Sequence, residues 1–244
     1  MKISVLCPSR SRPALALRMA HSALDTAKGP VEVLIGLDCD DPQRQDYYKM
    51  IDQSSGIPLF TFTPRVSVGH IWNELAKDAI SNVEDESESE QQDHLFLMAN
   101  DDIVFLTMGW DEAFASAARQ YPDRIFVMWA EDGINGANHA AFPCVSRKWI
   151  DTVGYFSPTD FKFFRHDTWI YDLGHRLGRL HFIPDVNIQH LHWSAGGVKD
   201  EITDLNRSSG QSQNDQRVWS ETDWRRVNDA QKLREVMIMR QVKA

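Results

Sequence analysis

Cysteine is scarce in this sequence, and so are long apolar runs, and each shortage narrows the class of protein. The 244 residues include three cysteines, an odd number, and no two of them are spaced as a CxxC pair. Disulfide-rich secreted domains need paired cysteines, so we expect a reduced, cytoplasmic protein. No apolar segment is long enough to cross a bilayer and no signal-peptide pattern opens the chain, which predicts a soluble protein.

Basic residues are also in the minority. The chain has 26 Lys and Arg against 35 Asp and Glu, a formal net charge of -9 at pH 7. Because non-specific nucleic-acid binding depends on Lys and Arg that neutralise phosphates, this balance argues against a general nucleic-acid-binding protein, although it leaves room for a local basic groove. Hydrophobic residues make up 42% of the chain, which is enough for a sizeable core in one large or two small domains.

Alternating strand and helix patterns predict an α/β fold. A β-branched strand over 2–7 is followed by a helix with apolar residues at Leu15, Met19 and Ala23, and then by a second strand over 31–37. A strand, a helix and a strand in so short a span form a βαβ unit with two parallel strands and a right-handed crossover. Further strands are expected over 59–63, 124–130, 180–183 and 186–192, and further helices over 69–81, 110–121, 148–153, 166–177 and 221–242.

Three segments have no apolar period. Residues 84–93 are acidic and nearly free of apolar side chains, which predicts a surface loop or a disordered insertion. Residues 131–142 are rich in Gly, Asn and Ala and should form a loop over the mouth of the sheet, and residues 196–214 should be flexible. We therefore divide the chain into a domain over 1–195 and an extension over 196–244 that ends in a helix.

An apolar run that begins at His94 ends abruptly in Asn100-Asp101-Asp102. Such a run is typical of a strand buried on both faces, and carboxylates at its carboxyl end lie where open α/β sheets bind ligands. Two adjacent acids need a counter-charge, and Mg²⁺ or Mn²⁺ carrying a diphosphate would supply one because these ions favour oxygen ligands. Taken alone, a solvated acidic turn explains the pattern equally well.

More polar residues follow other predicted strands. Asp38 and Asp40 come after the second strand, and Asp167 opens the helix over 166–177, where the helix dipole favours the ionised carboxylate. His190 and His192 alternate along a strand, so their side chains point to one face, and imidazoles beside carboxylates suit Mn²⁺ better than Mg²⁺. For each of these residues a purely structural role is about as well supported by the local sequence.

The order of four stretches resembles the nucleotide-sugar-dependent glycosyltransferases of the GT-A fold, in particular their family-2-like branch. The stretches are Val5-Leu6-Cys7-Pro8-Ser9-Arg10; Asn100-Asp101-Asp102 with Gly109-Trp110-Asp111; Val153-Gly154-Tyr155-Phe156 leading to His166-Asp167 and Arg176-Leu177-Gly178; and His190-Leu191-His192. They span roughly residues 1–192. Two positions depart from the family pattern, because Asn100 replaces the first acid of the DxD motif and His166 replaces a glutamate.

The resemblance implies a Rossmann-like GT-A sheet, mostly parallel and flanked by helices, in a single domain with a C-terminal helical extension. It implies metal-dependent transfer of a sugar from a nucleoside-diphosphate sugar, with UDP favoured, to an acceptor hydroxyl with inversion. Asp167 would be the general base, and Asp102, His190 and His192 would hold Mn²⁺ or Mg²⁺. The implied nucleotide-binding residues are Pro8, Ser9, Arg10, Asp38, Asp40, Asn73, Asn100 and Asp101, and the implied sugar contacts are Trp110, Trp129, His166 and Lys199.

Two other functions remain open at this point. A sugar-phosphate nucleotidyltransferase has a similar sheet but should carry a Gly-rich phosphate loop after the first strand, and the turn over 8–13 contains no glycine. A nucleotide-sugar-binding protein that has lost catalysis would explain Asn100 and His166. The acceptor also stays open between a lipid-linked or surface glycan, a protein, and a hydroxymethylated base in DNA, the last disfavoured by the acidic balance.

Overall fold

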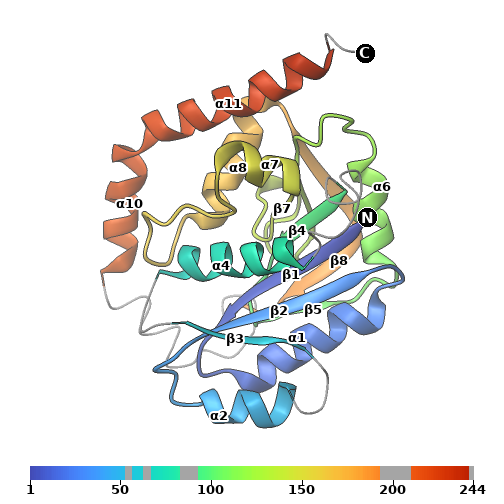
Figure 1. The fold of residues 1–244 in the computed structure, drawn as a ribbon, viewed down its shortest axis with the longest axis vertical. Helices are drawn as coiled ribbons and strands as arrows, with labels where there is room; N and C mark the ends of the chain where they lie inside the picture. The colour runs from blue at the N-terminus through green and yellow to red at the C-terminus, as the bar shows by residue number, and fades with distance from the viewer. Residues whose placement is uncertain (53–56, 63–66, 83–92, 193–209, 242–244) are drawn as a thin grey trace.

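The computed structural model describes residues 1–52, 57–62, 67–82, 93–192 and 210–241, and these form one mixed sheet with helices on both faces (Figure 1). The described strands are β1 (Lys2–Ser9), β2 (Val31–Asp38), β3 (Leu59–Phe62), β4 (His94–Met98), β5 (Ile103–Phe105), β6 (Val127–Glu131), β7 (Cys144–Ser146) and β8 (Leu180–His190). The described helices are α1 (Pro13–Thr26), α2 (Arg44–Tyr47), the π-helical η1 (Tyr48–Asp52), α4 (Val68–Ser81), α6 (Trp110–Ala118), the 3₁₀ turn η2 (Gly136–Asn138), α7 (Arg147–Val153), α8 (His166–Leu177), α10 (Gln211–Glu221) and α11 (Asp223–Gln241).

The strands follow the order β3-β2-β1-β4-β7-β6-β8-β5. The parallel pair predicted for the first two strands is confirmed, with Ile3 opposite Val31 and Ser9 opposite Leu37. β1 also pairs in parallel with β4, β2 with β3, and β6 with β8, whereas β7 is antiparallel to both of its neighbours and β5 is antiparallel to β8. The carboxyl ends of β1, β2 and β4 therefore lie side by side at one edge of the sheet.

Two apolar layers cover the two faces of this sheet. Alternate strand residues such as Val5 and Cys7 pack against α1 and α6, and the residue between them, Leu6, packs with α4, α7 and α8 on the other face. This is the alternation that a strand buried on both faces requires. Figure 1 shows α4 and α1 on opposite sides of the central strands.

The predicted helix ends are partly confirmed. α8 has the predicted bounds and ends at Gly178, whose φ of +65° only glycine adopts easily, and α7 ends in the same way at Gly154 with φ +91°. α6 stops at Ala118 rather than at residue 121. The break predicted at Pro184-Asp185 is wrong, since β8 runs through it with a shift of register against β6.

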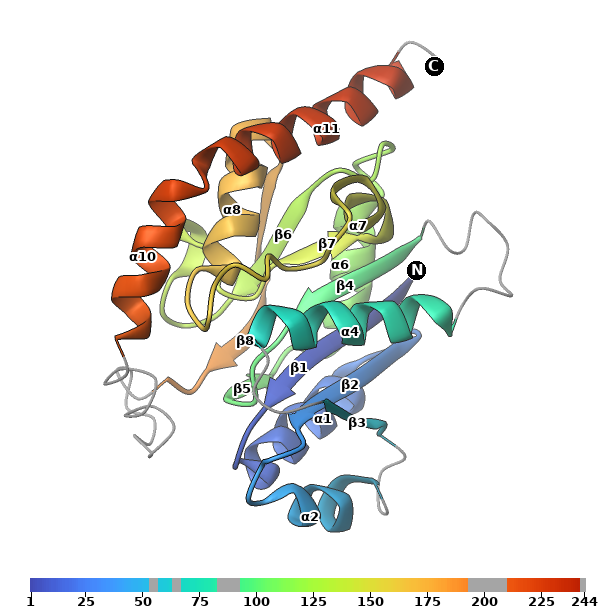
Figure 2. The same cartoon turned by 60° about the vertical axis from the view of Figure 1, so that its left-hand side comes forward.

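Two C-terminal helices, α10 and α11, replace the single helix predicted over 221–242, and they cover α8 (Figure 2). α10 starts at Gln211, inside the segment predicted to be flexible, and residues 193–209 lie outside the described residues, as do 83–92. Leu233 of α11 is fully buried, and Tyr155 donates a hydrogen bond to Asp229 of the same helix. Arg176 at the end of α8 pairs with Asp223 at 2.6 Å. These contacts fasten α11 onto α7 and α8.

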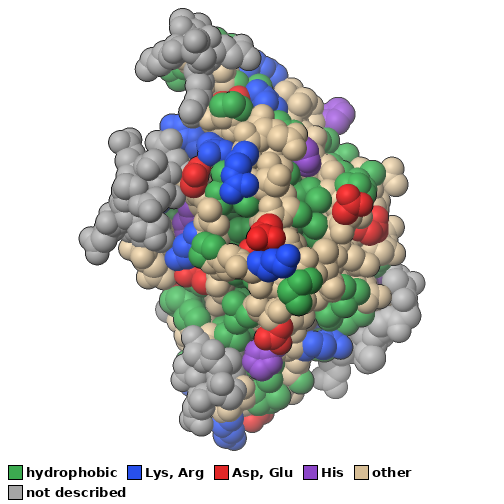
Figure 3. All heavy atoms as spheres, turned by 90° about the vertical axis from the view of Figure 1, so that its right-hand side faces the viewer, with side chains coloured by type: hydrophobic (Ala, Val, Ile, Leu, Met, Phe, Trp, Pro, Cys, Tyr) green, Lys and Arg blue, Asp and Glu red, His purple; other side chains and the backbone are tan. Residues whose placement is uncertain are grey.

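The surface carries charges of both signs. On the face around α6, acidic and basic side chains are interspersed with hydrophobic ones (Figure 3). None of the described helices is both long enough and apolar enough to cross a membrane. The three cysteines, all within the described residues, form no disulfide.

Candidate functional site

The carboxyl end of β1 meets the end of β4 through a buried carboxylate. Ser9, the last residue of β1, donates a hydrogen bond of 2.6 Å to Asp101 Oδ2, and Arg12 Nη1 lies 3.1 Å from Asp101 Oδ1. Asp101 is 5% exposed, and burial raises its pKa to about 6 although Arg12 favours the ionised form. Tyr47 completes this group, because its hydroxyl contacts Ser9 Oγ and accepts from the Arg12 backbone N–H.

The turn after β1 reaches the end of β2. Arg10 Nη1 lies 2.7 Å from Asp40 Oδ1 and 3.1 Å from Asp38 Oδ2, so this guanidinium joins two of the predicted nucleotide-binding acids. Ser11 has a φ of +56°, and Asp41 stabilises that conformation by accepting from the Ser11 backbone N–H at 2.8 Å. The turn is thus shaped before any ligand binds.

Asp102 contacts the end of β8. Its Oδ1 lies 3.5 Å from His190 Nε2, and its backbone carbonyl accepts from the Leu191 N–H at 2.8 Å. The rings of His190 and His192 are 5.2 Å apart. Burial opposes ionisation of Asp102, but the contact with His190 outweighs it and lowers the pKa of Asp102. The structure therefore brings together the three predicted metal ligands.

A metal ion fits this place only with help from other ligands. Across the part of the chain that the structure describes, no group of three His, Cys, Asp or Glu side chains is placed to hold a metal ion. Asp102 Oδ1 and His190 Nδ1 are both buried and make no hydrogen bond within that part. A carboxylate oxygen facing an imidazole is a donor set that Mn²⁺ accepts, and diphosphate oxygens and water would supply the remaining ligands.

A second acid–imidazole pair lies at the start of α8. Asp167 Oδ2 is 2.8 Å from His139 Nε2, and Asp167 Oδ1 accepts from the Thr168 backbone N–H at 2.7 Å. Burial opposes charge on both partners, yet their mutual attraction prevails, so the pKa of Asp167 is lowered and the pKa of His139 is raised. The sequence did not single out His139 as a functional residue. Only its position in the loop predicted to cover the sheet pointed to such a role.

The loop that carries His139 is held by one carboxylate. Asp132 Oδ1 accepts backbone N–H bonds from Ile134, Asn135 and Gly136 at 2.9, 2.6 and 3.2 Å. The Asp132 carbonyl accepts in turn from the His190 N–H at 2.9 Å, and the far end of the loop contacts the same histidine, because the Phe142 and His190 rings are 4.9 Å apart. The loop therefore begins and ends beside His190.

The two predicted tryptophan contacts are core residues. A sugar platform must expose a ring face, but Trp110 is fully buried between Phe105 and Phe114 and donates its indole N–H to the Ala23 carbonyl. Trp129 of β6 is 3% exposed, and its indole N–H donates to the Gly136 carbonyl at 2.9 Å, so it holds the loop against the sheet.

Two further predicted residues serve packing. Asn73 Oδ1 accepts from the Phe156 and Ser157 N–H groups while its amide donates to the Ser157 carbonyl, so this side chain fastens α4 to the loop before α8. His166 is 2% exposed and bonds Ser157 Oγ at 2.9 Å, and burial lowers its pKa to about 4. Lys199 lies outside the described residues.

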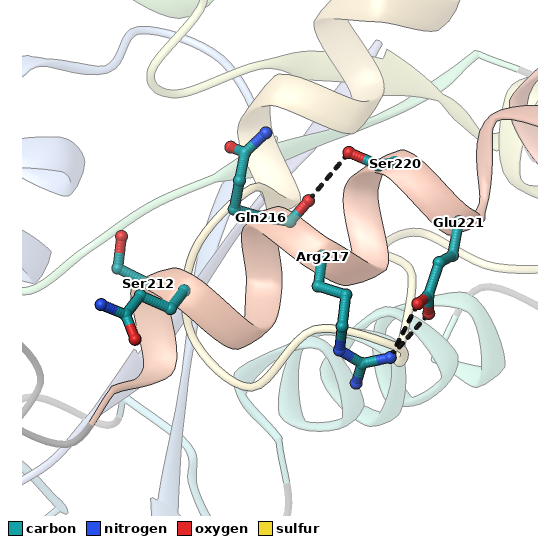
Figure 4. Close-up of a pocket in the computed structure, with 6 residues that line it drawn as sticks. Ser212, Gln216, Arg217, Ser220 and Glu221 are labelled. Atoms are coloured by element: carbon teal, nitrogen blue, oxygen red, sulfur yellow. Dashed lines mark hydrogen bonds and ion pairs between the residues drawn. The ribbon is translucent and has the colours of Figure 1, made fainter.

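We call the following residues the strand-end cluster, with an arginine side and an imidazole side. The arginine side consists of Ser9, Arg10, Arg12, Asp38, Asp40 and Asp101, and the imidazole side of Asp102, His190, His139 and Asp167. Of the other predicted residues, Pro8 and Asn100 lie at the ends of β1 and β4 and are partly exposed, and His192 lies beside His190 just after β8. None of these residues lines the hollow of about 650 Å³ on α10, where Arg217 pairs with Glu221 of the same helix (Figure 4).

Comparison with known proteins places this fold. No family model matches the sequence, and no curated protein matches it. S. aureus TarS matches with a TM-score of 0.58 and 14% identity over 78% of this chain and 36% of that one. TarS 1–349 in complex with UDP-GlcNAc matches with a TM-score of 0.58 and 15% identity over 83% of this chain and 63% of that one.

An archaeal structure matches as well. The mannosyltransferase PcManGT from Pyrobaculum calidifontis, in complex with GDP-Man and Mn²⁺, matches with a TM-score of 0.53 and 12% identity over 78% of this chain and 56% of that one. The chain thus spans less than two thirds of the length of each of these structures. Structural matches at identities this low establish the architecture alone. They confirm the architecture predicted from the sequence: the chain has the GT-A fold.

Proposed function

We propose that this protein transfers a sugar from a nucleoside-diphosphate sugar to an acceptor hydroxyl, using a divalent metal ion. The observation that carries the proposal is the strand-end cluster itself. A guanidinium-lined turn, the Asp102–His190 pair and the His139–Asp167 pair lie on one set of strand ends and on the loop that joins them. In open α/β sheets this edge is the place where ligands bind.

The arginine side suits the nucleotide. Arg10 is held by two carboxylates at the end of β2, and guanidinium groups recognise phosphate oxygens by paired hydrogen bonds. Asp38 and Asp40 offer acceptors for ribose hydroxyls or for the imide N–H of uracil, which is why UDP is favoured. Structural neighbours have been solved with UDP, UDP-GlcNAc and GDP-Man, and they support a nucleotide-sugar donor.

Asp102 and His190 would hold the metal ion. When bound, Mn²⁺ or Mg²⁺ would neutralise the charge that develops on the leaving nucleoside diphosphate. The buried Asp102 Oδ1 is suited to this role because it has an imidazole beside it and no hydrogen bond within the described residues. A mannosyltransferase of the same fold was solved with Mn²⁺, which supports a metal-dependent reaction.

The His139–Asp167 pair would serve the acceptor. A hydroxyl must lose its proton as it attacks, and this pair offers a carboxylate and an imidazole; its His139 lies in the loop whose far end contacts the metal ligand His190. Direct attack by the acceptor would invert the anomeric configuration. The acceptor itself remains open between a glycan, a lipid-linked sugar, a protein and a modified DNA base.

Thermal shift with UDP tests the proposal. UDP at about 100 times its dissociation constant should stabilise the folded protein by about 2.7 kcal/mol in the presence of Mn²⁺. In EDTA the shift should disappear, and an equal shift in EDTA would remove the metal from the proposal. A panel of UDP and GDP sugars, followed by assay of nucleotide release, then identifies the donor. Donor binding without release would favour a binding protein that has lost catalysis.

A further inference from the structure

His139 is the imidazole of the strand-end cluster that the sequence did not single out. It lies in the loop between β6 and β7, directly after the 3₁₀ turn η2, which packs against β6 and β8. The Asp132 hydrogen bonds give that loop a defined shape, and the His139 ring rests 5.1 Å from the Tyr171 ring on α8. The imidazole is therefore placed by packing from two elements and not by the Asp167 contact alone.

The carboxylate of Asp167 is already engaged on both of its oxygens. Oδ1 accepts from the backbone N–H of Thr168 at 2.7 Å and from the Thr168 hydroxyl at 3.2 Å, and Oδ2 faces His139 Nε2 at 2.8 Å. Hydrogen bonds to the charged form stabilise it and weaken it as a base. Asp167 is thus arranged to stay ionised.

The second nitrogen of His139 is in the opposite situation. Nδ1 makes no hydrogen bond to any residue that the structure describes, and the side chain is 26% exposed. Because Nε2 must carry a proton to bond the carboxylate, the neutral ring has its lone pair on Nδ1. A carboxylate that fixes the tautomer of an imidazole in this way prepares the opposite nitrogen to accept a proton.

We propose that His139 Nδ1 is the general base that deprotonates the acceptor hydroxyl, and that Asp167 is a positioning residue that orients and charges the imidazole. This inference rests on the proposed function and assigns the proton to a different residue from the one predicted by resemblance. The step needs no base outside the pair, because Asp167 keeps its three hydrogen bonds while His139 takes the proton.

The proton and electron balance is that of a simple displacement. The acceptor O–H bond breaks and its proton moves to His139 Nδ1, while the oxygen forms a new bond to the anomeric carbon of the donor. The bond from that carbon to the diphosphate oxygen breaks, and its electron pair leaves with the nucleoside diphosphate. The ring then carries two protons, and the imidazolium is stabilised by the adjacent Asp167 carboxylate.

The charges around the ring support this assignment. Asp167 on α8 and Asp132 in the same loop raise the pKa of His139, and burial and Arg165 oppose them without prevailing. Tyr171 on α8 contributes its ring face. A base works best when its pKa lies near the working pH; the contact between the two side chains raises the pKa of the His139 imidazole and lowers the pKa of the Asp167 carboxyl, which favours the imidazole as the base.

The first experiment titrates the ring directly. An NMR titration of ¹⁵N-labelled protein, with the signal assigned by its loss in His139→Gln, should give His139 a midpoint above the ordinary value of about 6.5. Asp167→Asn should move that midpoint down. A midpoint that Asp167→Asn leaves in place would overturn the pair, whatever the protein catalyses.

The second experiment follows release of nucleotide from the donor with water as acceptor, so that no acceptor need be known. The acidic limb of the kcat/KM profile should lie above pH 6 and should shift to lower pH in Asp167→Asn. His139→Gln, which can still donate to Asp167, should lose about 10²–10⁴-fold in kcat with unchanged affinity for UDP. The matched control is His175→Gln at an exposed position of the same helix α8, and it should change neither quantity.

Other outcomes separate the two proposals. An acidic limb below pH 5, together with nearly full activity in His139→Gln, would return the proton to Asp167 and overturn this inference alone. Failure of the wild-type protein to release nucleotide from any donor would overturn the proposed function. It would also overturn the catalytic role of His139, even if the NMR titration shows that Asp167 raises the pKa of His139. Thermal unfolding of each variant shows whether a loss of rate reflects a loss of fold.

Discussion

The two sides of the strand-end cluster neutralise their carboxylates in different ways. On the arginine side, Asp101 is paired with Arg12, and Asp38 and Asp40 share Arg10. On the imidazole side, Asp102 faces His190 and Asp167 faces His139. All five pairings lie at the strand ends, in the turns and the loop that follow them, or at the start of α8, so the difference lies in the chemistry of the cation.

This difference separates binding from proton transfer. A guanidinium stays protonated at every pH at which the protein is folded, so the arginine side keeps a fixed charge pattern that suits a fixed ligand such as a diphosphate. An imidazole gains and loses a proton near neutral pH, so the other side can change its charge during a reaction. Substitution of one member of each pair tests whether the two sides differ in this way.

The largest effect should come from Arg12→Met. Asp101 is buried, and removal of its guanidinium leaves an uncompensated carboxylate, which costs about 3–5 kcal/mol of stability when a buried pair is broken. Urea unfolding at pH 7 measures the loss. The double variant Arg12→Met, Asp101→Asn should recover much of the stability, because it removes the stranded charge. Equal losses in both variants would mean that Arg12 acts through packing alone.

Asp102→Asn should lower the free energy of unfolding less than Arg12→Met does, but it should lower the activity more. The change keeps the shape of the side chain and removes the charge that faces His190, so the fold should survive. Metal-dependent UDP binding should weaken, and release of nucleotide should fall by at least about 100-fold, since even residues behind the metal ligands cost 10–100-fold. Calorimetry with UDP and Mn²⁺ provides the affinity. A variant that keeps both its rate and its metal dependence would make Asp102 an ordinary turn residue.

The smallest effect, about 1 kcal/mol, concerns the pH dependence of stability. The raised pKa of His139 means that its contribution with Asp167 is complete below about pH 6.5 and is lost as the pH rises through that raised value. The lowered pKa of Asp167 means that the contribution is complete above about pH 4 and is lost as the pH falls through its lowered value.

Denaturation of matched variants checks that window. The stability lost in Asp167→Asn should be largest between about pH 4.5 and 6 and should shrink by pH 8.5. The loss in Asp38→Asn should stay constant from pH 6 to 8.5, because Arg10 keeps its proton. A flat profile for Asp167→Asn would show that the imidazole side is no more titratable than the arginine side.

The sequence was sufficient where local patterns decide the structure. α8 begins and ends where the apolar period and Gly178 predicted, and the carboxylates of Asp101 and Asp102 do follow a strand buried on both faces. Such features depend on residues a few positions apart. The same applies to the first βαβ unit, whose parallel pairing follows from its short connection.

The sequence was insufficient where distant residues decide the structure. His139 and Asp167 are 28 residues apart, and only the folding of the loop against α8 joins them. The resemblance implied that Trp110 contacts the sugar, but in space its neighbours are Phe105 and Phe114. The three-residue strand β7 carries too few residues to form a readable pattern.

The contacts of α11 have a consequence for how the protein can be handled. This helix buries Leu233 and bonds Tyr155, and Asp223 in its first turn holds Arg176. All of these contacts brace the back of α8, whose opposite end presents Asp167. A shortened version of the chain that stopped at residue 195 would leave an apolar surface of α7 and α8 facing water, and any worker who trims it for crystallisation should keep the last helix.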